Sequence, residues 1–395
     1  MQRFAALLER LSTTPARTAK LRLIGDHLAS VPDPDRGLAL AALTGGLELP
    51  AVKPALIRAL IEARTDPVLF RLSYDYVGDL AETVALLWPG TSPAPPPSLA
   101  EAVEALRAAT RATAPATLAG LLDRLDASGR FALLKLATGA LRVGAGARLA
   151  RVALAERFGL DVAAVEEVWH GLEPPYAPLF AWAEGHGPRP SPGDGFRPFM
   201  LAHPLEAPDA LDLAAHAVEW KWDGIRAQAV VGGGTRRLFS RDGNDISAAF
   251  PDLVAALPDT PLALDGELLV RGADGHPASF NALQSRLNRK APDARLLRRA
   301  PVFLRAYDLL AEAGQDLRPL PWEARRARLE RLVATLPPER FDLSPLVPVP
   351  TLEALAEARA RPPHPGIEGL MLKRRDSPYL AGRVTGHWWK WKKAP

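Results

Sequence analysis

The chain has 395 residues, of which 48% are hydrophobic and 24% are charged, a composition typical of a globular protein with two or three domains. It contains no cysteine, which excludes disulfide bonds, thiolate catalysis and zinc sites built on cysteine. The net charge of +4 is too small to indicate nucleic-acid binding by itself, and no apolar run approaches the roughly 18 residues that a membrane span needs.

The N-terminal part of the chain is expected to be helical. Apolar residues recur at spacings of three and four, as in Phe4-Leu7-Leu8-Leu11, from the first residue to about residue 180. The first ten residues form an amphipathic pattern without the order of a signal peptide, so we expect a cytoplasmic protein. The stretch 89–98 is rich in proline and is predicted to be an exposed loop between helices.

A change of composition divides the chain. Residues 184–195 are rich in glycine and proline, as interdomain linkers are. We therefore expect a helical domain at 1–185, a linker at 186–196 and a second domain at 197–395. Short β-type runs and a few amphipathic helices predict an α+β fold for the second domain; the runs are 227–231, 262–270, 302–309 and 369–373, and the clearest helix is 324–336.

A candidate nucleophile lies near the start of the second domain. Residues 219–226 read Glu-Trp-Lys-Trp-Asp-Gly-Ile-Arg, which sets Lys221 in a Lys-x-Asp-Gly-x-Arg frame with Glu219 before it and Arg226 at its end. A lysine amine attacks phosphorus only when it is unprotonated, which requires desolvation or neighbouring positive charge. Taken alone, the string is equally well explained as a solvated turn.

Further polar segments follow in a fixed order: 240–243 (Ser-Arg-Asp-Gly), 264–269 (Leu-Asp-Gly-Glu-Leu-Leu), 279–287, 305–310 (Arg-Ala-Tyr-Asp-Leu-Leu), 367–373 (Ile-Glu-Gly-Leu-Met-Leu-Lys) and 388–392 (Trp-Trp-Lys-Trp-Lys). Singly, they are explained as a hairpin turn, an amphipathic helix, a core aromatic or a solvated basic tail. The run 264–269 is more informative, because a buried strand seldom carries two carboxylates unless something pairs with them. In this order the segments resemble the covalent nucleotidyltransferase superfamily, and within it bacterial ATP-dependent DNA ligases.

The resemblance implies an all-α DNA-binding domain followed by an α+β nucleotidyltransferase domain, an ATP-grasp-like adenylation domain. It implies that Lys221 takes AMP from ATP as a phosphoramidate. Glu219 would accept a hydrogen bond from the adenine amino group, and Tyr307 would stack on the purine. Arg226 would reach the ribose and the phosphates, and Arg241 would lie near the nucleotide and the DNA end.

The remaining motif residues are implied to bind metal and phosphate. Glu267 would bind the ribose or a metal, and Glu368 would hold Mg²⁺. Lys373 would lie near the α-phosphate. The alternation at 390–392 would place Lys390 and Lys392 on one face of a strand and Trp391 on the other, so two ammonium groups would face the triphosphate. The expected cofactors are ATP and Mg²⁺.

The helical domain points to the substrate. Residues 133–154, with Arg142, Gly144 and Arg148, resemble the DNA-binding domain of larger ligases. Glycines let backbone amides approach a phosphate backbone and arginines neutralise it, so such contacts position a duplex without reading its sequence. We expect a monomer that seals nicks in duplex DNA at the nucleoid, in repair, replication or recombination.

Two alternatives stay open at this point. One is an RNA ligase or a capping-type guanylyltransferase, and the other is a nick-binding protein that has lost catalysis. The absence of cysteine argues against NAD-dependent ligases, which carry a four-cysteine zinc module. Ligases of this family continue into a small OB-type β-barrel after the last basic motif, whereas the printed chain stops two residues after Lys393. We therefore expect adenylation from ATP to be impaired.

Overall fold

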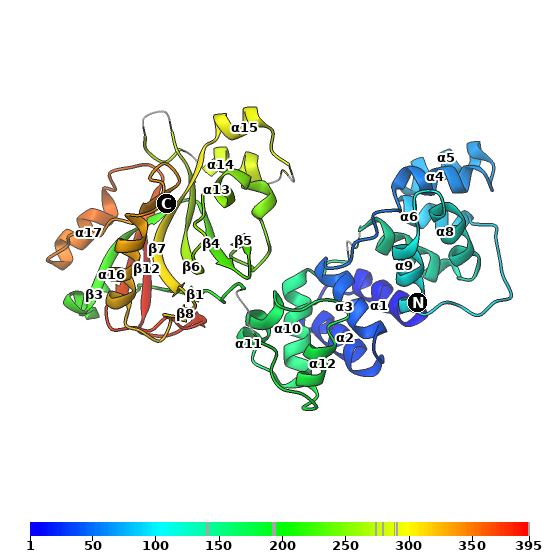
Figure 1. Cartoon of the computed structure of the whole chain (residues 1–395), viewed down its shortest axis with the longest axis horizontal. Coiled ribbons are helices and arrows are strands. Elements are labelled where there is room, and N and C mark those ends of the chain that lie inside the picture. The colour runs from blue at the N-terminus through cyan, green and yellow to red at the C-terminus, as the bar shows by residue number, and fades with distance from the viewer. Residues whose placement is uncertain are drawn as a thin grey trace. The chain divides into compact units, whose positions relative to one another are not determined.

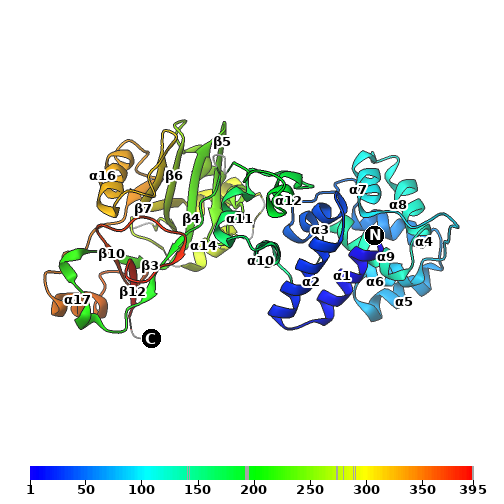
Figure 2. The same ribbon diagram turned by 90° about the horizontal axis from the view of Figure 1, so that it is seen from below.

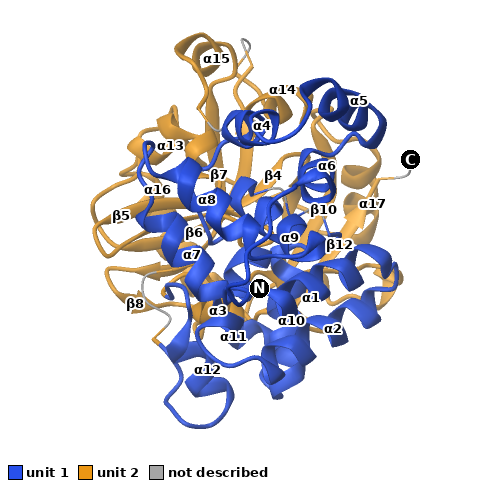
Figure 3. Ribbon diagram, turned by 90° about the vertical axis from the view of Figure 1, so that its right-hand side faces the viewer, with its two compact units in different colours: residues 1–165, 172–190 blue, residues 166–171, 191–395 orange. Residues whose placement is uncertain are grey.

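The computed structural model describes residues 1–139, 141, 143–191, 195–272, 275–278, 280–287, 289 and 291–393. The chain forms two compact units, coloured separately in Figure 3. Unit 1 consists of residues 1–165 and 172–190, and unit 2 of residues 166–171 and 191–395. Figures 1 and 2 show helices throughout unit 1 and twisted sheets with covering helices in unit 2.

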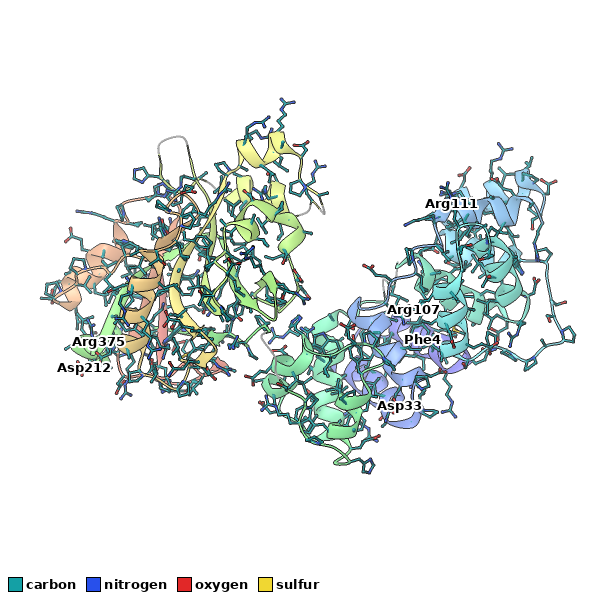
Figure 4. All side chains as sticks on the ribbon, in the orientation of Figure 1. Phe4, Asp33, Arg107, Arg111, Asp212 and Arg375 are labelled. Atoms are coloured by element: carbon teal, nitrogen blue, oxygen red, sulfur yellow. The ribbon has the colours of Figure 1, made fainter. Side chains whose placement is uncertain are left out.

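Unit 1 is helical, which confirms the prediction for the N-terminal part of the chain. Its core is made of leucine, isoleucine and alanine from several helices, and Phe4 of the first helix, marked in Figure 4, is 2% exposed. The helices are α1 (Gln2–Thr13), α2 (Arg17–Ser30), α3 (Asp35–Thr44), α4 (Pro54–Glu62), α5 (Pro67–Val77), α6 (Leu80–Leu87), α7 (Leu99–Ala108), α8 (Ala114–Asp123), α9 (Ala127–Thr138), α10 (Ala147–Phe158), α11 (Val162–Trp169) and α12 (Ala177–Ala183). The second half of α11, from residue 166, is assigned to unit 2.

Local sequence signals set several helix ends in unit 1. Asp66 caps α5 and Asp126 caps α9 by accepting hydrogen bonds from backbone N–H groups of the first turn. Gly78 and Gly139 end the same two helices in the left-handed conformation, which glycine adopts without steric cost. The proline-rich segment 89–98 lies between α6 and α7 and is not helical, as predicted.

Unit 2 contains two main sheets and the helices that cover them. A four-stranded sheet has the order β2-β12-β10-β3, a six-stranded sheet has the order β5-β4-β6-β7-β8 with β9 beside β7, and β1 pairs with β11. The strands are β1 (Met200–Leu201), β2 (His203–Pro204), β3 (His216–Trp222), β4 (Ile225–Gly232), β5 (Thr235–Ser240), β6 (Leu262–Val270), β7 (Val302–Glu312), β8 (Gln315–Asp316), β9 (Phe341–Leu343), β10 (Ile367–Arg374), β11 (Gly382–Arg383) and β12 (Trp388–Lys392).

The helices of unit 2 are α13 (Pro251–Ala255), α14 (Phe280–Leu287), α15 (Ala294–Arg299), α16 (Trp322–Val333) and α17 (Leu352–Ala360), with short 3₁₀ turns η1 (Pro208–Ala210), η2 (Leu213–Ala215) and η3 (Ser247–Ala249). The predicted strands and the predicted helix 324–336 are thus confirmed to within a few residues at their ends. Ser279, the first residue of the predicted helix 279–287, lies outside the described residues.

Three apolar layers hold unit 2 together. Leu253 of α13, Leu283 of α14 and Leu329 of α16 cover one face of the six-stranded sheet. The other face packs against the four-stranded sheet through residues that include Val230, Ala263 and Trp388. The outer face of the four-stranded sheet is closed by a cluster that includes Leu355 of α17. Polar side chains that lie between the two sheets are therefore held by buried strands on both sides.

Within the residues that the structure describes, no helix is long and apolar enough to cross a membrane.

Candidate active site

A cavity of about 510 Å³ lies between the two sheets of unit 2. Its walls come from β3, β10 and β12 of one sheet and from β4, β6 and β7 of the other. Ten residues singled out from the sequence line it, although they span more than 170 positions of the chain: Glu219, Lys221, Arg226, Arg241, Glu267, Tyr307, Glu368, Lys373, Lys390 and Lys392. The structure thus brings the predicted catalytic, nucleotide and metal residues into one space.

Strand register explains how the lysines converge. In the four-stranded sheet, Lys221 of β3 and Lys392 of β12 both pair with Gly369 of β10, which lies between them. The next row holds Glu219, Met371 and Lys390. Because side chains alternate along a strand, these residues share the face that borders the cavity, whereas Trp391 packs in the outer cluster with Leu370. The predicted alternation at 390–392 is present in this strand.

Gly369 has no side chain, so β10 carries none between Lys221 and Lys392 in this row of the sheet. Its φ is +150°, and a Cβ there would lie 2.2 Å from the carbonyl oxygen of Trp391 on the neighbouring strand. No side chain other than hydrogen fits this close approach. The glycine of the 367–373 segment therefore lets β10 and β12 come together directly beside Lys221.

Lys221 is paired with an acid. Its Nζ lies 2.6 Å from Oε2 of Glu368, and Lys392 Nζ lies 3.3 Å from the same oxygen. Burial, followed by the charge of Glu368 and a hydrogen bond to it, raises the pKa of Asp223. The two cations hold the pKa of Glu368 below its usual value against the opposing effect of burial. The candidate nucleophile is thus positioned by a carboxylate within a group of like-charged neighbours.

Glu219 and Lys373 form a buried pair at another wall of the cavity. Lys373 Nζ lies 3.1 Å from Glu219 Oε1, and both side chains are 2% exposed. The same ammonium donates to the backbone oxygen of Tyr307 at 3.4 Å and lies 4.4 Å from the centre of its ring. A flat aromatic face and a carboxylate acceptor are therefore adjacent, and in this structure one ammonium group contacts both.

Arg226 is anchored from the six-stranded sheet. Its Nε and Nη2 donate to the two oxygens of Asp265 at 3.2 and 2.7 Å, and the hydroxyl of Tyr379 donates to Asp265 Oδ2 at 2.6 Å. Asp265 is fully buried. This pairing answers the question raised by the two carboxylates of 264–269, because the first of them is neutralised by Arg226.

The second carboxylate, Glu267, lines the cavity and could contact a ligand or a metal ion there. Burial, partly opposed by the charges of Lys221 and Arg226, raises its pKa to about 8. In the described part of the chain, no cluster of three or more histidine or acidic side chains could by itself hold a metal ion. Mg²⁺ is nevertheless often held by only one or two carboxylates together with phosphate oxygens and water. Glu267 and Glu368, which line the same cavity, fit that donor set.

Arg241 follows β5 and is exposed at the rim of the cavity. Sequence reasoning missed Arg383, which also lines the cavity, and Trp388, whose ring lies 4.7 Å from Lys373 Nζ. Burial, together with the positive charges of Arg383 and nearby lysines, lowers the pKa of Lys390. Trp388 belongs to the quoted 388–392 run and could have been found from its alternation with Lys390; for Arg383 we find no such signal.

Gly144 and Arg148, two of the residues predicted to bind DNA, belong to unit 1 and do not line this cavity. Arg142 lies outside the described residues. Gly144 has a φ of +63°, and a Cβ there would lie 2.4 Å from Nζ of Lys20, which donates to the backbone oxygens of Val143 and Gly144 at 3.0 Å. Arg148 is exposed in the first turn of α10. The glycine therefore makes room for a lysine of its own unit.

Comparison with known proteins gives the family. A family described as "ATP dependent DNA ligase domain" matches residues 199–392. A "Probable DNA ligase" of Anaeromyxobacter dehalogenans is 31% identical over 99% of this chain and 74% of its own length. A "Probable DNA ligase" of Streptomyces coelicolor is 37% identical over 49% of this chain and 38% of its own length. Among solved structures, the ligase domain of LigD from M. tuberculosis is 34% identical, with a TM-score of 0.40 over 49% of this chain and 59% of that one.

These matches confirm the family and the enzyme class that the sequence motifs predict. They rest on sequence along nearly the whole chain, through both the helical part and the segment that forms the cavity. The chain belongs to the family of ATP-dependent DNA ligases.

Proposed function

We propose that this chain seals nicks in duplex DNA, with Lys221 as the nucleophile that takes AMP from ATP. The observation that carries the proposal is the placement of Lys221 in one cavity with both a carboxylate pair and a convergent set of cations. First, the Lys221 nitrogen attacks the α-phosphorus, loses a proton and displaces pyrophosphate. The AMP then passes to the 5′-phosphate of the nick and frees the lysine. Finally, the 3′-hydroxyl attacks that phosphate, forms the phosphodiester bond and releases AMP.

The buried wall of the cavity is the proposed adenine site. Tyr307 offers a ring face and Glu219 a carboxylate acceptor, and Lys373 Nζ contacts both. An adenine ring presents the same two features, an apolar face and an N–H donor at its edge. We infer that adenine stacks on Tyr307, donates its amino N–H to Glu219 and shifts Lys373 toward the α-phosphate.

The proposed phosphate site consists of the cations along the same face. Lys390 and Lys392 lie one row apart on β12, and Arg226 is held by Asp265 on the opposite wall. Positive charge fixed in this way stabilises the charge that develops on the phosphate oxygens without further reorganisation. Arg241 at the rim is proposed to contact the nucleotide and the DNA end.

Glu267 and Glu368 are the proposed holders of Mg²⁺. Two observations support this assignment. Burial raises the pKa of Glu267, and a divalent cation beside it would stabilise its ionised form. Glu368 is paired with Lys221, and a divalent cation would replace the lysine charge when Lys221 moves to the phosphate. When bound, the ion would supply charge neutralisation of the phosphate oxygens. Release of Glu368 from its ion pair would let the Lys221 nitrogen move toward the α-phosphorus, which it attacks once it has lost its proton to solvent.

We propose that the helical unit binds the duplex on either side of the nick. The exposed Arg148, the first turn of α10 and the loop at Gly144 offer backbone N–H groups and positive charge suited to phosphate oxygens. Arg142, which lies outside the described residues, is proposed to add to this surface. Contacts of this kind are independent of base sequence, as an enzyme that must find any nick requires. We further propose that the chain acts as a monomer at the nucleoid.

Intact-mass measurement after incubation with Mg-ATP tests the nucleophile. We expect a single AMP adduct that is absent with Mg-GTP and absent in Lys221→Ala. Lys393→Ala serves as the matched control, because Lys393 follows β12 without lining the cavity. If no adduct forms, sealing of a nick that already carries 5′-AMP tests the last step separately. Failure of both reactions would refute the proposed function.

A further inference from the structure

A buried arginine behind the proposed adenine site is not used by the reaction as described above. Arg326 of α16 is 6% exposed, and its Nη1 lies 3.8 Å from Oε1 of Glu219. Its other nitrogens are committed: Nε donates to Glu330 at 2.8 Å and Nη2 donates to the backbone oxygen of Ser344 at 2.8 Å. Nη1 itself has no hydrogen-bond partner among the described residues. A buried donor without a partner is costly, so its position needs a reason.

The reason lies in the charge of Glu219. The side chain of Glu219 is 2% exposed, and an isolated buried carboxylate is strongly unfavourable unless a cation accompanies it. In this structure the cation at hydrogen-bonding distance is Lys373. The proposed function moves that ammonium toward the α-phosphate when adenine takes its place against Tyr307. Glu219 then needs a second cation as its partner, because a buried carboxylate without one is unfavourable.

We propose that Arg326 is the positioning residue that keeps Glu219 paired with a positive charge and oriented, and that it thereby selects the base of the nucleotide. The proposal rests on the adenine contact of Glu219 in the proposed function. From 3.8 Å, the Nη1 group needs to approach Oε1 by about 0.6 to 1 Å to reach hydrogen-bonding distance. Its orientation is fixed because the Glu330 and Ser344 contacts hold the other two corners of the guanidinium.

An acceptor fixed in this way discriminates between purines. Adenine carries an N–H donor at its sixth position, which can donate to Glu219. Guanine carries an oxygen there, and two acceptors facing each other in a buried site repel. A purine with only hydrogen at that position makes neither interaction. The contribution of Arg326 is therefore measured by how much the protein gains from the amino group itself.

The experiment compares binding of ATP with binding of purine riboside triphosphate, which lacks the 6-amino group. Dissociation constants are measured by tryptophan fluorescence in chelator, so that no transfer occurs; Trp388 in the cavity wall provides the signal. A charge-assisted hydrogen bond predicts a preference for ATP of about tenfold to a hundredfold in the unmodified chain. In Arg326→Gln, which keeps N–H donors for Ser344, we expect the preference to fall to about threefold or less.

Two further variants separate the effect on the base from an effect on folding. Arg326→Lys retains the positive charge and should restore most of the preference. Arg328→Gln is the matched control on the same helix, since Arg328 pairs with Glu312 and Gln315 away from the cavity and should leave the preference unchanged. A merely structural role of Arg326 would weaken both nucleotides by the same factor and leave their ratio intact. The readout is the ratio, which a partly destabilised variant still reports.

The outcomes are distinguishable. A preference in the unmodified chain that persists in Arg326→Gln would overturn the inference and leave the adenine site intact. Equal binding of both nucleotides by the unmodified chain would overturn the adenine contact of Glu219, and the inference with it. A preference that disappears in Arg326→Gln, returns in Arg326→Lys and persists in Arg328→Gln would establish Arg326 as the residue that positions Glu219.

Discussion

Replacement of Asp265 by asparagine should destabilise unit 2 and release Arg226. Asp265 is fully buried and accepts two hydrogen bonds from Arg226 and one from Tyr379. Asparagine keeps the shape and one acceptor oxygen, but it removes the negative charge that accompanies a guanidinium in the protein interior. The variant therefore leaves a buried cation without its counter-ion.

The size of the effect follows from that imbalance. Removal of one partner of a buried ion pair costs about 3 to 5 kcal/mol, and the retained amide oxygen places the expected loss near the lower end, about 3 kcal/mol. For a unit of roughly 200 residues, each 1 kcal/mol corresponds to about 2 to 4 °C, so we expect the melting temperature to fall by about 6 to 12 °C. Tryptophan fluorescence follows unit 2, because seven of the nine tryptophans belong to its residues, all but Trp88 and Trp182.

Tyr379→Phe is the matched control for this experiment. It removes one hydrogen bond to Asp265 and leaves the ion pair with Arg226, so the expected loss is only about 1 kcal/mol. If Asp265→Asn costs no more than Tyr379→Phe, the charge of Asp265 does not hold Arg226 and the account of that wall of the cavity is wrong. Asp265→Asn should also weaken ATP binding, because Arg226 would no longer be held in its position on the cavity wall.

Three other changes have definite expected outcomes. Gly369→Ala introduces a Cβ 2.2 Å from the Trp391 carbonyl oxygen, so the free energy of unfolding should fall by at least about 2 kcal/mol. Intact-mass measurement should also show that the AMP adduct is lost. Gly366→Ala is the control and should change neither quantity. Burial lowers the pKa of His27 from 6.5 to about 4, so folding favours the neutral imidazole. The free energy of unfolding is therefore unaffected by this group above pH 6.5, and it decreases as the pH falls from 6.5 to 4, because the unfolded chain binds the proton first. His27→Gln should therefore remove about 3 kcal/mol of acid sensitivity from the unfolding free energy of unit 1. Burial raises the pKa of Glu267 from 4.5 to about 8, so folding favours the protonated carboxyl and the stability of the chain falls as the pH rises through this range. In chelator, the melting temperature of Glu267→Gln should therefore exceed that of the unmodified chain at about pH 8.5. The two melting temperatures should agree at pH 4.5 or below.

The sequence was sufficient for the parts of the site that local periodicity controls. The β-type run 262–270 coincides with β6, and the alternation of lysine and tryptophan at 390–392 gives the two faces of β12. Strand alternation is a property of the backbone, so it can be read without knowledge of the fold. The sequence also indicated that the two carboxylates of β6 need positively charged or hydrogen-bonding partners, because burial of an unpaired charge is unfavourable in any fold.

Pairings between distant strands were not visible in the sequence. Glu219 and Lys373 are 154 positions apart, and they meet only because β3 and β10 pair in one register. Arg326 belongs to an ordinary amphipathic helix pattern, and nothing in that pattern indicates that its guanidinium reaches Glu219. The sequence predicts that Gly144 contacts a phosphate backbone, but it gives no sign that a Cβ at this position would also meet Lys20. Each of these contacts depends on tertiary packing, which outweighs any local signal.

The pairs in the cavity suggest how binding is made favourable. Lys221 is paired with Glu368, Lys373 with Glu219 and Arg226 with Asp265, so these three cations do not lie unpaired in the cavity. Phosphate oxygens must then replace carboxylates around the lysines, and the released carboxylates must find new positive partners. Under the proposals above, Glu368 would gain the divalent cation and Glu219 would keep Arg326. Arg226 would stay with Asp265, which is fully buried. Under the proposed function, binding of the nucleotide would exchange ion pairs within the protein for ion pairs with the ligand, and it would avoid most of the desolvation that a pocket of unpaired charges would require.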